Sequence, residues 1–123
     1  RNAFDLASVS QAERMRYGYH TFGQSVLMAK RLAEAGVQLV TVYWHREKKT
    51  IDSTWDTHSL NFQELKLRLM PSVDRPIAAL LEEGQLRKAN GRSPLDRCVP
   101  AVSCLVLLRP FSFVLVMTKV MDH

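Results

Sequence analysis

The pattern that most constrains the fold lies in residues 21–44, where a helix pattern, a glycine and a strand pattern follow one another directly. The apolar side chains of the first part recur at helical spacing, at Phe22, Val26, Ala29 and Ala33. Lys30, Arg31 and Glu34 lie outside this stripe. Thr21 and Gln24 have the spacing of a capping box, which predicts that the helix begins there.

Gly36 follows the last apolar position of this helix, where a left-handed C-terminal cap favours glycine. The next eight residues, VQLVTVYW at 37–44, are rich in β-branched and aromatic side chains. Such a run is typical of a strand that is covered on both faces. A helix, a glycine and a buried strand in this order predict an α/β layer protein.

A polar stretch without helical or strand periodicity occupies residues 45–60, and we expect a long loop there. Loops that leave the carboxyl end of a strand are where open α/β sheets place their sites. Helical spacing returns over 61–83, with Asn61 and Glu64 as a second capping pair. Pro71 and Pro76 each remove a backbone donor, so this helix should be broken or kinked, with Pro71 in the first turn of its second half.

Asp56 and His58 are the candidate metal ligands, two residues apart in the stretch TWDTHSLNF. A carboxylate and a neutral imidazole are a common ligand set for a divalent metal, and in extended backbone both side chains point to the same side. The alternative is an ordinary polar turn that caps the following helix. His45 and Asp52, in the same loop, are either further ligands or solvated loop residues.

Length, charge and composition limit which other classes of protein this chain can belong to. The 123 residues fit one small domain, and the net charge of +5 raises the question of nucleic-acid binding. The basic residues do not gather in one run, so we expect a solvated surface and no nucleic-acid partner. Arg109 and Pro110 split the apolar stretch 99–121 into two runs shorter than the ~18 residues that span a bilayer, so no membrane partner is expected. Cys98 and Cys104 lack the spacing of a zinc site.

Four stretches together resemble a known family: AFDL at 3–6, RYGYHTFGQSVLMAKRLAEAGVQLVTVYW at 16–44, WDTHSLNF at 55–62 and KLRLMPSVDRPIAALLEE at 66–83. They are similar to the central part of the bacterial sulfatase-like family of unassigned function within the alkaline phosphatase superfamily. The resemblance implies an α/β, alkaline phosphatase-like three-layer fold with a central sheet flanked by helices. Residues 1–83 would be a central segment of that domain, and 84–123 a divergent or frame-shifted tail with two short strands.

The resemblance also implies a function. Asp56 and His58 would bind a divalent metal, zinc or similar, and the chain would be a fragment of a metal-dependent hydrolase of phosphate or sulfate esters. The family's GEFGRTP-like and GRDHW-like motifs do not follow Glu83, and the nucleophile segment would precede Arg1, so we expect the fragment to be inactive alone. The parent protein would be exported or periplasmic. The alternative is a non-catalytic binding or structural domain on the same fold.

Overall fold

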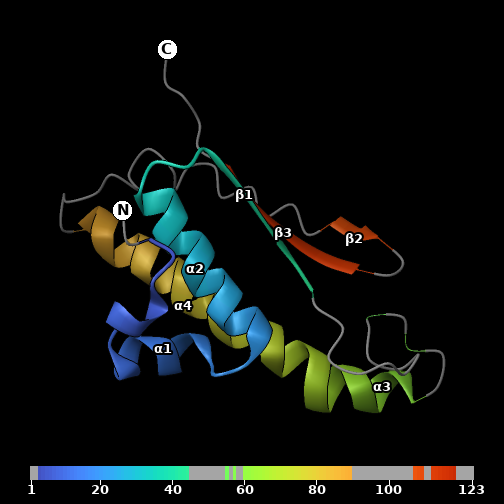
Figure 1. Cartoon of the computed structure of the whole chain (residues 1–123). Helices are drawn as coiled ribbons and strands as arrows, with labels where there is room; N and C mark the ends of the chain where they lie inside the picture. Colours follow the sequence, from blue (N-terminus) through green and yellow to red (C-terminus); the bar gives the residue numbers. More distant parts are fainter. Residues whose placement is uncertain are drawn as a thin grey trace.

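The computed structural model describes residues 3–44, 55, 57, 60–89, 107–109 and 112–118 (Figure 1). Along the chain, the elements are the 3-10 turn η1 (Leu6–Ser8), α1 (Gln11–Tyr17), α2 (Thr21–Glu34), β1 (Leu39–Tyr43), α3 (Asn61–Glu64), the π-helical segment η3 (Leu65–Leu69), α4 (Met70–Ala89), β2 (Leu107–Arg109) and β3 (Ser112–Thr118). Helices therefore predominate, and the three strands form one sheet.

The core is centred on α2, which contacts α1, α4 and β1. Tyr17, Val26 and Leu27 have no exposed surface. Val42 of β1 and Val73 of α4 join the same apolar cluster. The helices α1 and α4 and the strand β1 thus share one core with α2. They fully cover the face of α2 that carries Val26 and Leu27.

The helix α2 begins at the predicted place, but its cap differs from the predicted one. His20 is the N-cap residue, and its Nδ1 accepts a hydrogen bond from Gly23 N at 3.1 Å. The side chain of Gln24 instead donates to the carbonyl oxygens of Arg14 and Gly18. The predicted capping box of Thr21 and Gln24 is therefore wrong, because imidazole fills the capping position and the Gln24 amide is used to bind the end of α1.

The end of α2 confirms the prediction for Gly36, whose φ of +98° lies in the left-handed region. Val37 N donates to Leu32 O and Gly36 N donates to Ala33 O, both at 3.0 Å. These two bonds are the Schellman motif, which satisfies helix carbonyls that have no partner within the helix. The chain then turns directly into β1.

The sheet is antiparallel, with strand order β1-β3-β2. Both apolar runs of the segment 84–123 contain a strand, as predicted. Val42 is buried toward α2, whereas Leu39 and Tyr43 are 60% and 67% exposed. The described residues therefore cover β1 on one face and not on both, because the helices lie on one side of it (Figure 1). The three-layer arrangement stays a prediction.

The helix after the loop is interrupted ahead of Pro71, as predicted. Met70 N donates to Leu65 O, the wider spacing of a π turn, and α4 begins at Met70. Pro71 has no N–H to donate, and its ring would crowd the preceding turn of a regular α-helix. Pro76 is buried inside α4, which continues to Ala89 rather than ending near residue 83.

The second predicted capping pair, Asn61 and Glu64, is wrong. Leu60 occupies the N-cap position with a φ of 58°, and no side chain caps the helix there. Glu64 instead pairs with Arg68 one turn later, at 2.5 Å. Within the described residues, no helix is long and apolar enough to cross a membrane.

Candidate functional site

The segment that carries the candidate metal ligands is anchored at the carboxyl end of β1 by a contact between two tryptophans. The ring of Trp44, the residue after β1, lies 5.2 Å from that of Phe22 in the first turn of α2. Trp55 meets Trp44 edge to face, with ring centroids 5.6 Å apart. Aromatic pairs at this separation are favourable beyond the area that they bury. The loop thus returns to the core one residue before Asp56.

The sequence-predicted ligands themselves, Asp56 and His58, lie outside the described residues, as do His45 and Asp52. Thr57, between the two ligands, is described. Its hydroxyl donates to the side-chain oxygen of Asn61, the first residue of α3. Among the residues that the structure describes, no three His, Cys, Asp or Glu side chains come together as a metal site. A metal at the loop would therefore depend on Asp56 and His58 with further ligands.

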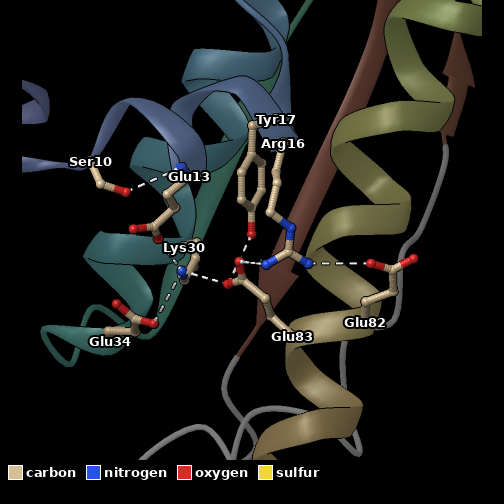
Figure 2. Close-up of polar contacts among 8 residues, drawn as sticks. All are labelled: Ser10, Glu13, Arg16, Tyr17, Lys30, Glu34, Glu82 and Glu83. Carbon is tan, nitrogen blue, oxygen red and sulfur yellow. Dashed lines mark hydrogen bonds and ion pairs between the residues drawn. The ribbon is translucent and has the colours of Figure 1, made fainter.

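Apart from this loop, a cluster of charged side chains lies between α1, α2 and α4 (Figure 2). Lys30 of α2 is only 4% exposed, and its Nζ lies 2.7 Å from Glu13 of α1 and 2.5 Å from Glu83 of α4. Glu34 lies farther away, at 3.9 Å. Lys30 lies outside the apolar stripe predicted from the sequence, yet its side chain is buried. The neighbouring helix α1 and the helix α4, which is distant in sequence, cover this face and supply the carboxylates that compensate the buried charge.

Glu83 is shared by three partners in this cluster. Besides Lys30, it accepts a hydrogen bond from Tyr17 Oη at 3.2 Å and from Arg16 at 3.1 Å. Arg16 also reaches Glu82 at 3.2 Å, with both side chains largely exposed. Lys30 Nζ further lies 5.8 Å from the centre of the Tyr17 ring. The cluster thus ties the three helices together through one buried ammonium group and one mostly buried carboxylate.

The pKa values of Lys30 and Tyr17 are both raised. Burial alone would lower the pKa of Lys30, but hydrogen bonds to Glu13 and Glu83 outweigh it and raise the pKa above its usual value. Burial is the largest cause for Tyr17, and the negative charge of Glu83 adds to it, so the pKa of the phenol is raised as well. The fold therefore holds a charged lysine and a neutral tyrosine side by side.

These shifts predict a loss of stability at alkaline pH. A raised folded-state pKa stabilises the fold below the unfolded-state pKa, about 10 for tyrosine and 10.4 for lysine, and this contribution is lost as pH rises above it. We expect the free energy of unfolding to fall as pH rises above about 10, on the order of 1 kcal/mol per pH unit for each group that titrates. Urea unfolding at several pH values measures it.

Tyr17→Phe is the matched variant for this experiment, since it removes the phenol and keeps the ring. Its stability should fall less steeply with alkaline pH than that of the parent chain, because only the Lys30 contribution remains. Identical slopes for the two proteins would contradict the role given to Tyr17.

A shallow cavity of about 310 Å³ lies between α2 and β1. Met28, Leu32 and Val40 are among the residues that line it. Ser25 also lines it, but its hydroxyl donates to Thr21 O at 2.8 Å.

In the described residues, a buried lysine joins three helices, and a tryptophan pair holds a loop residue against the end of a strand. Residues 1–87 match the profile of a family described as proteins of unknown function, DUF1501. The chain belongs to this family. No curated protein and no solved structure matches it.

The family match corrects the resemblance drawn from the sequence. The resemblance of residues 3–83 to a sulfatase-like family of the alkaline phosphatase superfamily is wrong as an assignment: the matched family is DUF1501, whose description names neither group. Stretches such as RLAEAGV and WDTH, which carried the resemblance, lie within the matched region 1–87. They therefore identify a family without identifying an activity.

Proposed function

We propose that the chain contributes a divalent-metal site to a hydrolase of phosphate or sulfate esters, with Asp56 and His58 as ligands. The observation that supports this is the contact of Trp55 with Trp44. It fastens the chain at the residue before Asp56, at the carboxyl end of β1. The contact of Thr57 with Asn61 fastens the chain again between the two ligands. A metal site requires that its ligands be held in place, and contacts of the residues on either side of Asp56 favour this.

The donor set suits the chemistry. A carboxylate supplies negative charge, and a neutral imidazole supplies a directional nitrogen lone pair, so zinc or a similar ion fits the pair. Such a metal, when bound, lowers the pKa of a bound water and neutralises charge on a phosphoryl or sulfuryl group. The role of Asp56 and His58 is to hold it at the end of β1. Zinc takes three or four protein ligands, so these two need others, for which His45 and Asp52 are candidates.

The test is the metal content of the purified 123-residue chain and of its Asp56→Ala/His58→Ala variant. We expect the parent to bind Zn²⁺ and the variant to lose at least about tenfold in affinity, since even residues that support ligands cost this much. Isothermal titration with Zn²⁺ and elemental analysis after dialysis measure it. Asp74→Ala is the matched control, because Asp74 is an exposed carboxylate on α4. Equal Zn²⁺ affinity in all three proteins would sink the proposal.

A second candidate, a non-catalytic binding or structural domain, is favoured by the hydrogen bond between Thr57 and Asn61. In this case the Asp-Thr-His stretch is a turn that leads into α3. The double variant would then have the same metal content as the parent, and only its stability would change. Urea unfolding of the same proteins distinguishes the two candidates. The export of the parent protein stays a prediction.

A further inference from the structure

We draw no further inference here: the strongest candidate, the shallow cavity between α2 and β1 that Met28, Leu32 and Val40 help to line, carries none because nothing in the described part of the chain shows what occupies or covers it.

Discussion

Gly23→Ala is expected to lower the free energy of unfolding by about 3 kcal/mol, a severe case of overpacking. Gly23 lies in the first turn of α2, where α1 ends against it. A Cβ atom at this position would lie 2.0 Å from Tyr17 O and 2.9 Å from Gly18 O. Both are backbone atoms, so no side-chain rotation relieves the contact. The end of α1 would have to separate from α2, although Tyr17 is fully buried.

Gly36→Ala is the matched control for this substitution. A Cβ there meets nothing within 4 Å, but the φ of +98° is unfavourable for alanine. Its cost should be about 1 to 2 kcal/mol from backbone strain alone. Urea unfolding followed by circular dichroism measures both variants. If Gly23→Ala lost no more stability than Gly36→Ala, the close approach of α1 and α2 would not be a main constraint on the fold.

Lys30→Met is expected to lower the free energy of unfolding by about 3 kcal/mol, the scale of removing one partner from a buried ion pair. Methionine keeps the apolar stem of the side chain, so the loss reflects the ammonium group. Without the ammonium group, the carboxylates of Glu13 and Glu83 would face the same position with no cation between them. Glu83 keeps Arg16 and Tyr17 as partners. Glu13 is therefore the carboxylate most affected.

Two further variants test this account of the cluster. Lys66→Met removes an exposed lysine from η3 and should change stability by no more than about 0.5 kcal/mol. Adding Glu13→Gln to Lys30→Met should recover part of the loss, since it removes the carboxylate left without its cation. Chemical denaturation of the four proteins gives the comparison. A double variant as unstable as Lys30→Met, or more so, would argue against like-charge repulsion as the cause.

The parts of the fold that could be predicted are those decided by neighbouring residues. Gly36 ends α2 because a left-handed backbone favours glycine, and Pro71 interrupts the next helix because it lacks an N–H. The helix of residues 21–34 and the strand that follows were also visible as periodicity. Each of these features depends on steric and hydrogen-bonding limits within a few residues, so the sequence is enough.

The candidate site was predictable to a smaller extent. The stretch around Asp56 and His58 stands out by residue type and spacing, and Trp55 marks where the loop meets the core. The family resemblance placed it in the wrong group, since similar motifs alone do not establish an activity. The buried cluster around Lys30 was missed. The spacing of Lys30 and Glu34 was the one local sign of it.

By itself, then, the sequence determined where α2 begins and ends and where the next helix is interrupted, because backbone sterics act over one or two turns. The tertiary structure decided which polar residues are buried. Lys30 reads as a surface residue until Glu13 of α1 and Glu83 of α4 are brought to it. His20 reads as an ordinary residue until α2 uses it as a cap. Desolvation and charge pairing depend on which segments meet in space, and that follows from the packing of the whole core.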